Sequence, residues 1–352
     1  MKTNEKILVT GATGFLGGRI VEILHLTKFK GVRATIHQWS TAARLGRIPV
    51  EIVEMDLMEP AQIDKALDGI THVVHCAKGP EDVTVEGTRN LLEASLRKSI
   101  KHFIHLSSAE VYGNVNGEVD ESFPLTYSGS AYNKMKVDAE KICQEYMGKG
   151  LPITIFRPSI IYGPFSNYWT TRYLKMMVNG EWGIYEKYGN GKANLIFVDD
   201  LVGLILKTLD NEKAFCQAFN ANGPEVISWN EYFKKINDKM GLPPLKTIKI
   251  SQANFKATLM RPVRFAGEMV RAHFMGPVKK LAETFTFAKI LMKRTEHALK
   301  TTPAKEDFGL YQKDVIYKNN KLEEILDWRP KFSVDEGVQV SVEWGKIQGF
   351  LL

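Results

Sequence analysis

The chain has 352 residues, of which 44% are hydrophobic and 25% are charged, and its formal net charge is +7. This composition is typical of a globular protein and argues against a disordered chain and against a membrane-spanning one. The length predicts one large domain and a smaller lobe. The basic excess is concentrated in residues 246–305, which hold 13 Lys or Arg and three Glu. That segment fits either a solvated helical face or a surface for an anionic partner.

The chain begins with a short polar segment that leads directly into an apolar strand, and no leader pattern is visible there. Cys76, Cys143 and Cys216 lie far apart without a CxxC pair, so neither a disulfide framework nor a zinc site is predicted. We therefore expect a cytoplasmic protein that works without a metal.

Short apolar runs alternate with helical patterns over the first two thirds of the chain, as in βαβ units with a parallel sheet. The predicted strands cover residues 7–10, 32–36, 51–54, 71–75, 102–106, 153–156, 195–198 and 218–220, and the predicted helices include 85–97 and 131–147.

The predicted fold class is α/β, a doubly wound parallel sheet of the Rossmann type with a smaller, mainly helical C-terminal lobe. We expect a dinucleotide-binding domain over 1–165, with late strands near 194–221 returning to its sheet. The substrate-binding lobe is expected over 166–352, including a basic helical insertion at 245–310.

A glycine-rich segment at residues 10–18, TGATGFLGG, follows the first strand and opens a helix. Its glycines permit a tight turn, a close approach of the backbone to a pyrophosphate and close helix–sheet packing. The N–H groups at the helix start attract an anion. Because the spacing is GxxGxxG and not GxGxxG, an ordinary tight turn is the alternative. The predicted cofactor-binding residues here are Gly11, Thr13, Gly14, Phe15, Leu16 and Gly17.

The second strand is not followed by the carboxylate that folds preferring NAD usually place on the adenosine ribose. Arg33, His37 or Arg44 could instead meet a 2′-phosphate, so NADP is slightly favoured over NAD. Asp56 and Leu57 follow the third strand and are expected to bracket the adenine, although an Asp at a strand end is as often a cap.

Tyr132 and Lys136 are four residues apart on a predicted helix, so both side chains lie on one face. A lysine ammonium near a phenol lowers the tyrosine pKa and lets the hydroxyl act as a base or an acid. A surface Tyr beside a solvated Lys would give the same pattern. Ser107 and Ser108 strengthen the catalytic interpretation, because they follow the fifth strand at the edge where ligands bind. Their alternative role is to cap a turn.

Taken together, these segments resemble the extended short-chain dehydrogenase/reductase family, the NAD-dependent epimerase/dehydratase group. The motifs are TGATGFLGG at 10–18, SSAEVYG at 107–113, YNKMK at 132–136, RPSIIYGP at 157–164, FVDDL at 197–201 and LDWRP at 326–330. The resemblance runs from residue 6 to about residue 340 and is interrupted near 245–310. It implies a homodimer with Ser108, Tyr132 and Lys136 as catalytic residues. It also implies that Pro158 lies beside the nicotinamide and that Cys76 and Ala77 line the pyrophosphate or ribose.

The chain departs from this family at Thr84, where many relatives have Asn, and in the loop at 75–79. Ala109 stands where the dehydratase branch has an acidic Asp, so dehydration ranks below epimerisation or simple dehydrogenation. The expected function is NAD(P)-dependent hydride transfer on a hydroxyl or ketone substrate, with a nucleotide sugar favoured. The alternatives are a sterol- or flavonoid-type NADP dehydrogenase and a non-catalytic dinucleotide-binding sensor or scaffold.

Apolar residues recur at steps of three and four within 277–300, which predicts an amphipathic helix. Its apolar stripe could pack on the substrate lobe or make a peripheral membrane contact. Nucleic acid is not an expected partner, because no nucleic-acid-binding motif accompanies the charge.

Overall fold

The computed structural model describes residues 5–249, 251, 255, 258, 259, 262 and 305–350. The chain divides into two compact units. The first comprises Met1–Ser166, Asn194–Glu225 and Val315–Gly337, and the second comprises Asn167–Ala193, Val226–Asp314 and Val338–Leu352. The amphipathic helix predicted at 277–300 lies outside the described residues.

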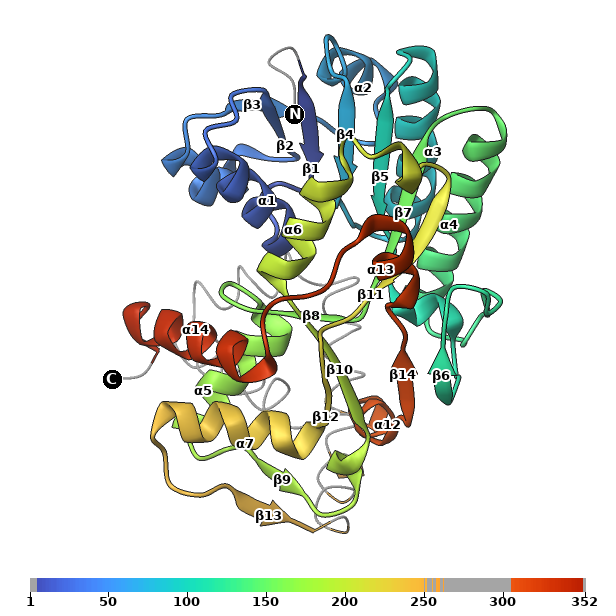
Figure 1. Ribbon diagram of the computed structural model, residues 1–352. Helices are drawn as coiled ribbons and strands as arrows, with labels where there is room; N and C mark the ends of the chain where they lie inside the picture. The colour runs from blue at the N-terminus through green and yellow to red at the C-terminus, as the bar shows by residue number, and fades with distance from the viewer. Residues whose placement is uncertain are drawn as a thin grey trace. The chain divides into compact units, whose positions relative to one another are not determined.

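A seven-stranded parallel sheet forms the centre of the first unit, in the order β11-β7-β5-β4-β1-β2-β3 (Figure 1). The strands are β1 (Ile7–Thr10), β2 (Val32–Ile36), β3 (Glu51–Glu54), β4 (His72–His75), β5 (His102–Leu106), β7 (Ile153–Pro158) and β11 (Gln217–Ala221). The strand order runs outward in opposite directions from β1 and β4, and ligands bind at the carboxyl ends of the strands beside such a reversal. The predicted doubly wound Rossmann fold is confirmed.

Helices cover both faces of this sheet (Figure 1). One face carries α1 (Phe15–Leu26) and α6 (Val198–Thr208), and the other carries α2 (Pro60–Ala66), α3 (Glu81–Arg97) and α4 (Ala131–Gly148). Because both faces of the sheet are covered, most strand residues are buried, and the central positions of β1, β4 and β5 are apolar. On the α2–α4 side, for example, Val73 and Phe103 share a core with Leu91 of α3 and Ile142 of α4.

Two parts of the predicted domain organisation differ from the structure. The late strand β10 (Lys192–Phe197) does not return to the seven-stranded sheet, because its residues 195–197 pair with β8 (Ile160–Tyr162). Residues 315–337, expected in the substrate lobe, belong to the first unit. They include β14 (Val315–Tyr317), which pairs with β6 (Gly117–Val119), and α13 (Asn320–Leu326). The apolar side chains of Val315 and Tyr317 explain this placement, since both are buried in a cluster with Val111 and Val119.

The second unit is organised around aromatic side chains. Its described elements are α5 (Arg172–Val178), β9 (Gly183–Tyr185), β12 (Val226–Ser228), α7 (Trp229–Met240), β13 (Lys246–Ile248), α12 (Lys305–Gln312) and most of α14 (Val334–Ile347). Tyr173, Trp182 and Phe233 pack with ring centroids 5.0–5.2 Å apart, in tilted and edge-on arrangements. Such ring pairs add to the stabilisation from the buried area.

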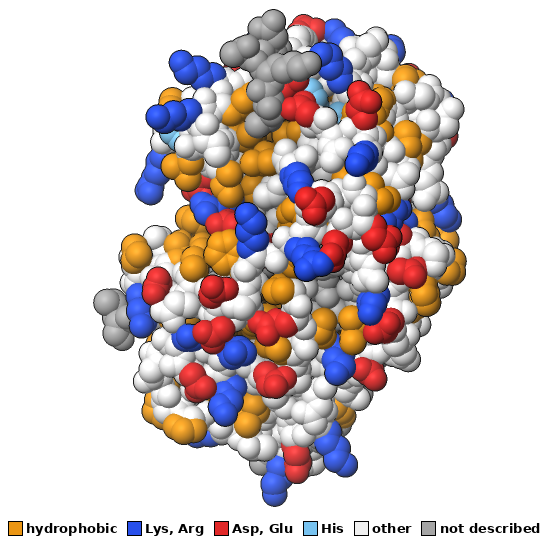
Figure 2. Space-filling model, in the orientation of Figure 1, with side chains coloured by type: hydrophobic (Ala, Val, Ile, Leu, Met, Phe, Trp, Pro, Cys, Tyr) orange, Lys and Arg blue, Asp and Glu red, His pale blue; other side chains and the backbone are white. Residues whose placement is uncertain are grey.

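The described surface carries charge of both signs. On the face drawn in Figure 2, Lys and Arg side chains are interspersed with Asp and Glu. Among the described helices, none combines the length and the apolar character that a membrane crossing requires.

Candidate active site

The glycine turn is packed too closely for side chains. Gly11 has φ +66°, and a Cβ there would lie 2.8 Å from the backbone of both Cys76 and Ala77. A Cβ on Gly17 would lie 2.4 Å from the Gly11 carbonyl oxygen. The Ala77 N–H donates to Thr10 Oγ1 at 3.2 Å. The turn, the first turn of α1 and the loop after β4 are therefore held in contact at the carboxyl edge of the sheet.

Gly14 differs from its two neighbouring glycines because it is exposed. A Cβ built on it would meet only the Gly11 carbonyl oxygen, at 3.1 Å, within 4 Å. Gly14 precedes α1, no side chain caps that helix, and Thr13, Phe15 and Leu16 are partly exposed beside it. The first N–H groups of a helix have no partner within it and carry the positive end of its dipole. These residues fit the pyrophosphate of a dinucleotide.

The residues expected at the adenosine end lie after β2 and β3. His37 is exposed, and its Nδ1 lies 3.9 Å from Asp56 Oδ2. The other Asp56 oxygen accepts from the Met58 N–H at 2.9 Å, so Asp56 also caps a turn, as the alternative interpretation anticipated. The Leu57 side chain is buried in the core beside α3. His37 and Asp56 are thus two polar side chains that this region offers to an adenosine.

Arg33 and Arg44 were considered as partners of a 2′-phosphate. The proposal for Arg33 is wrong, because its buried guanidinium donates to the carbonyl oxygens of Ala66 and Asp68. Arg44 pairs with Glu22 at 2.9 Å, and the same Glu22 oxygen also pairs with Arg19 at 3.0 Å. The structural argument for NADP over NAD is therefore weaker than the sequence suggested.

Ser108, Tyr132 and Lys136 come together from two elements. Ser108 follows β5, and its hydroxyl accepts from the Glu110 N–H, as in the capping alternative, while it also hydrogen-bonds Tyr132. Tyr132 and Lys136 lie in the first turns of α4, and the buried Lys136 ammonium donates to the Leu106 carbonyl at 2.6 Å. The predicted trio therefore shares the carboxyl end of β5.

The electrostatics of this trio differ from the expectation that Lys136 lowers the pKa of Tyr132. Desolvation raises the pKa of Tyr132, and the hydrogen bond to Ser108 opposes that rise. Burial lowers the pKa of Lys136 to about 8, with a further lowering by the positive charge of Lys78. The Lys78 ammonium lies 4.8 Å from the centre of the Tyr132 ring. Lys78 belongs to the altered loop after β4, but the sequence alone gave no reason to place it beside Tyr132.

A buried ion pair supports the site, and the sequence reasoning missed it. Glu140 is fully buried; its Oε2 accepts from the Ser107 hydroxyl at 2.7 Å and its Oε1 accepts from Arg157 Nε at 2.9 Å. Arg157 also donates to the Tyr112 hydroxyl at 2.9 Å. These contacts join β5, α4 and β7 just behind the trio. The available signals were the position of Glu140 four residues after Lys136 on one helix face and the Arg that precedes Pro158 in a matching motif.

The groups beneath Lys136 are held neutral. His75 is buried, hydrogen-bonds Thr10 at 2.7 Å and Thr88 at 3.1 Å, and burial lowers its pKa to about 3. Burial raises the pKa of the Cys76 thiol to about 12. Cys76 is therefore protonated at neutral pH and is not a reactive thiolate.

A doubly wound sheet that places a glycine turn, a serine and a Tyr–Lys pair at its carboxyl edge defines a dinucleotide-dependent enzyme of the extended short-chain type. Comparison with known proteins gives the family. The family model described as the NAD dependent epimerase/dehydratase family matches residues 7–222, and the chain belongs to this family.

Similar proteins include enzymes with different substrates. N-acetyl-alpha-D-glucosaminyl-diphospho-ditrans,octacis-undecaprenol 4-epimerase of Escherichia coli O157:H7 is 26% identical over 257 residues, 67% of this chain and 73% of that protein. Sterol demethylase protein B of Methylococcus capsulatus is 33% identical over 171 residues, 45% of this chain and 52% of that protein. Among solved structures, dTDP-glucose 4,6-dehydratase from Bacillus anthracis in complex with NAD has a TM-score of 0.73 at 18% identity and covers 97% of both chains. At that identity the likeness shows the fold alone.

Proposed function

We propose that this protein catalyses hydride transfer between a nicotinamide dinucleotide and a hydroxyl or ketone group of a sugar substrate carried on a nucleotide, with Tyr132 as the acid–base. The observation that carries the proposal is the convergence of Ser108, Tyr132 and Lys136 beside the glycine turn. Membership of the epimerase/dehydratase family supports it, as do relatives named for nucleotide sugars, such as UDP-glucose 4-epimerase of Vibrio cholerae.

Each side chain of the trio has a distinct task. When bound, the nicotinamide ring accepts or returns a hydride. Tyr132 removes the proton from the substrate hydroxyl as the ketone forms, and returns it when the ketone is reduced. Ser108, already hydrogen-bonded to Tyr132, orients the substrate oxygen. Lys136 holds the ribose of the bound cofactor, and the Lys78 ammonium, 4.8 Å from the centre of the Tyr132 ring, is a positive charge beside the phenolate once Tyr132 loses its proton.

Two outcomes are possible for the ketone. In an epimerase it turns over and receives the hydride on its other face, whereas in a dehydrogenase it leaves. Dehydration ranks below both, because the buried methyl side chain of Ala109 cannot deliver the proton that elimination needs. Ala109 therefore favours epimerisation or simple dehydrogenation.

The test uses purified full-length protein. Mass spectrometry of the ligand retained on the protein would identify the cofactor, and a panel of nucleotide sugars is then assayed at 340 nm and by product analysis. Tyr132→Phe should reduce turnover by about 10²-fold or more while leaving cofactor binding intact. Tyr146→Phe, at the other end of α4, is the matched control and should keep wild-type turnover. Near-normal turnover in Tyr132→Phe would contradict the assignment, and cofactor binding without any turnover would favour the non-catalytic alternative.

A sterol-type oxidation is the second candidate function. It is favoured by the similarity to sterol demethylase protein B, the higher in identity of the two relatives described above. The same trio would remove the proton from a sterol hydroxyl, so the site chemistry does not separate the two. Activity on hydroxysteroids, with none on the nucleotide-sugar panel, would decide for this candidate.

The expected homodimer and a peripheral membrane contact through 277–300 remain proposals. Light scattering of the purified protein would measure the first, and sedimentation with anionic vesicles would measure the second.

A further inference from the structure

Thr84 and the loop at 75–79, the two departures from the family pattern, lie against each other in the structure. Thr84 is in the first turn of α3 and is buried. The Gly79 N–H donates to its hydroxyl at 3.1 Å, and the hydroxyl donates to the Gly79 carbonyl at 3.0 Å. A Cβ on Gly79 would lie 2.8 Å from the Val83 side chain, so the loop fits closely on α3. The two departures therefore form one structural unit.

Lys78 lies between two anchored residues of this loop. Before it, the Ala77 N–H donates to the Thr10 hydroxyl at 3.2 Å. After it, Gly79 is held by Thr84. The backbone around Lys78 is thus tied to β1 on one side and to α3 on the other. Because this backbone is already ordered, placing the Lys78 side chain costs only side-chain entropy.

The Lys78 ammonium faces the ring of Tyr132. Lys78 is exposed, and its Nζ lies 4.8 Å from the ring centre of Tyr132, which is 36% exposed. A cation within about 6 Å of a ring centre is attracted by the negative face of the ring. A phenolate carries a full negative charge that is spread over its oxygen and its ring. The attraction therefore becomes stronger when Tyr132 loses its proton.

The other charged groups near Tyr132 come from two elements. Desolvation raises the pKa of Tyr132, and the negative charge of Glu110, in the short helix Ala109–Tyr112, raises it further. Lys136 lies one turn further along α4, and burial lowers its pKa to about 8. Above pH 8 Lys136 is mostly neutral, so Lys78 is then a cation that can oppose the effect of Glu110.

We propose that Lys78 is the charge partner of Tyr132: its ammonium stabilises the phenolate that forms during hydride transfer, and Thr84 positions the loop that carries it. A unit charge about 5 Å away changes an ionisation equilibrium by about fourfold in water, and by more where water is excluded. The consequence for catalysis rests on the function proposed above. The effect on the ionisation of Tyr132 does not, because it is a property of the resting protein.

The first test measures the ionisation of Tyr132 in the full-length protein without substrate or cofactor. NMR of tyrosines labelled with ¹³C at Cζ distinguishes phenol from phenolate, and Tyr132→Phe identifies the signal. At about pH 10 Lys136 is neutral, so the signal reports on Lys78. The ratio of phenolate to phenol should be at least about threefold lower in Lys78→Met than in Lys78→Arg, whose guanidinium stays charged.

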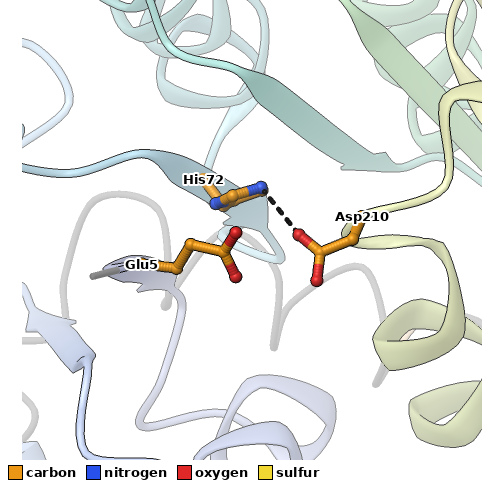
Figure 3. A group of neighbouring side chains, drawn as sticks. All are labelled: Glu5, His72 and Asp210. Carbon is orange, nitrogen blue, oxygen red and sulfur yellow. Dashed lines mark ion pairs between the residues drawn. The ribbon is translucent and has the colours of Figure 1, made fainter. Parts of the chain in front are cut away.

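Lys101→Met is the matched control, because it removes the same charge from the opposite edge of the sheet. Lys101 is exposed and directly precedes β5. Figure 3 shows the region on which its charge acts, where His72 lies beside Glu5 and Asp210, with Nε2 3.6 Å from Asp210 Oδ1. This variant should keep the wild-type ratio of phenolate to phenol at Tyr132.

The role of Thr84 is tested in the same experiment. Thr84→Val removes the hydroxyl that holds Gly79 and should move the ratio towards that of Lys78→Met. Thr84→Ser keeps a hydroxyl and should restore the wild-type ratio. A purely structural role of Thr84 would lower the stability of both α3 and the loop without changing the ionisation of Tyr132.

A second readout uses the substrate that the nucleotide-sugar panel identifies. Oxidation of a hydroxyl needs ionised Tyr132, so its rate rises with pH. The pH of half-maximal kcat should be higher in Lys78→Met than in Lys78→Arg, with the dissociation constant of the dinucleotide unchanged. Equal phenolate ratios in these two variants would overturn the proposal. Weaker dinucleotide binding by Lys78→Met with an unchanged ratio would also overturn it and would assign Lys78 to a cofactor phosphate. A lack of turnover on every substrate would count against the proposed function, while the NMR result would still decide the role of Lys78.

Discussion

Lys136 provides a prediction that can be tested without knowing the substrate. Burial of the ammonium lowers the pKa of Lys136 in the folded protein to about 8, from 10.5 for a solvent-exposed lysine. Since a tenfold change in proton affinity is about 1.4 kcal/mol, the charged form costs the folded state about 3 kcal/mol. Between pH 8 and 10.5 the unfolded chain binds more protons than the folded protein does. The free energy of unfolding should therefore gain a contribution of about 3 kcal/mol as the pH rises through that window.

The assay compares wild type with Lys136→Met by urea unfolding at several pH values from 7 to 10.5. The contribution from Lys136 is absent in the variant, while every other titrating group is shared. The stability of wild type relative to the variant should thus increase with pH. Lys78→Met provides a further check: removing the Lys78 charge should raise the folded-state pKa of Lys136, so the lower edge of the window should move to higher pH and the gain in stability should become smaller. A stability difference that stays constant from pH 7 to 10.5 would refute the reasoning.

Three further predictions concern the cofactor region and its support. Gly17→Ala should destabilise the protein by about 2 kcal/mol or more and weaken dinucleotide binding, because its Cβ would meet a backbone oxygen at 2.4 Å. Gly14→Ala should weaken dinucleotide binding with little loss of stability. Thermal unfolding measures the loss of stability, and cofactor titration measures the loss of binding. Glu140→Gln should cost about 3–5 kcal/mol in urea unfolding, because the buried Arg157 charge loses its partner, and a loss below 1 kcal/mol would contradict this. His37→Asp should shift the ratio of dissociation constants at least tenfold towards NAD, because a carboxylate after β2 repels a 2′-phosphate, and an unchanged ratio would remove His37 from cofactor selection.

The sequence predicted best what depends on local pattern. Several of the buried parallel strands are near-continuous apolar runs. Seven of the eight predicted strands, including Val32–Ile36 and His102–Leu106, lie in the central sheet with ends matching to within a few residues. The glycine turn and the Tyr132–Lys136 spacing are also local. They predicted the placement of the proposed cofactor and catalytic residues because helix and turn geometry fixes neighbours a few positions apart.

The parts that failed depend on contacts between distant residues. Periodicity says which face of an element is apolar but not which partner covers it, and so the pairing of β10 with β8 was not visible. Arg33 was a plausible phosphate ligand until the chain 33–35 residues further on supplied its carbonyl partners. The Glu140–Arg157 pair likewise joins two separate elements, α4 and β7, and the spacing of Glu140 from Lys136 did not show which residue would be its partner.

The histidines of β4 and β5 show why distant contacts also decide the electrostatics. His75 and His105 are opposite each other on neighbouring strands, and both add polar rings to an otherwise apolar core near Lys136. Burial and the nearby Lys136 charge lower the pKa of both, to about 3 for His75, so neither carries charge at neutral pH. If either ring were protonated, its repulsion would drive the proton from Lys136. The neutrality of these rings is therefore a condition for the positive charge that Lys136 contributes to the site.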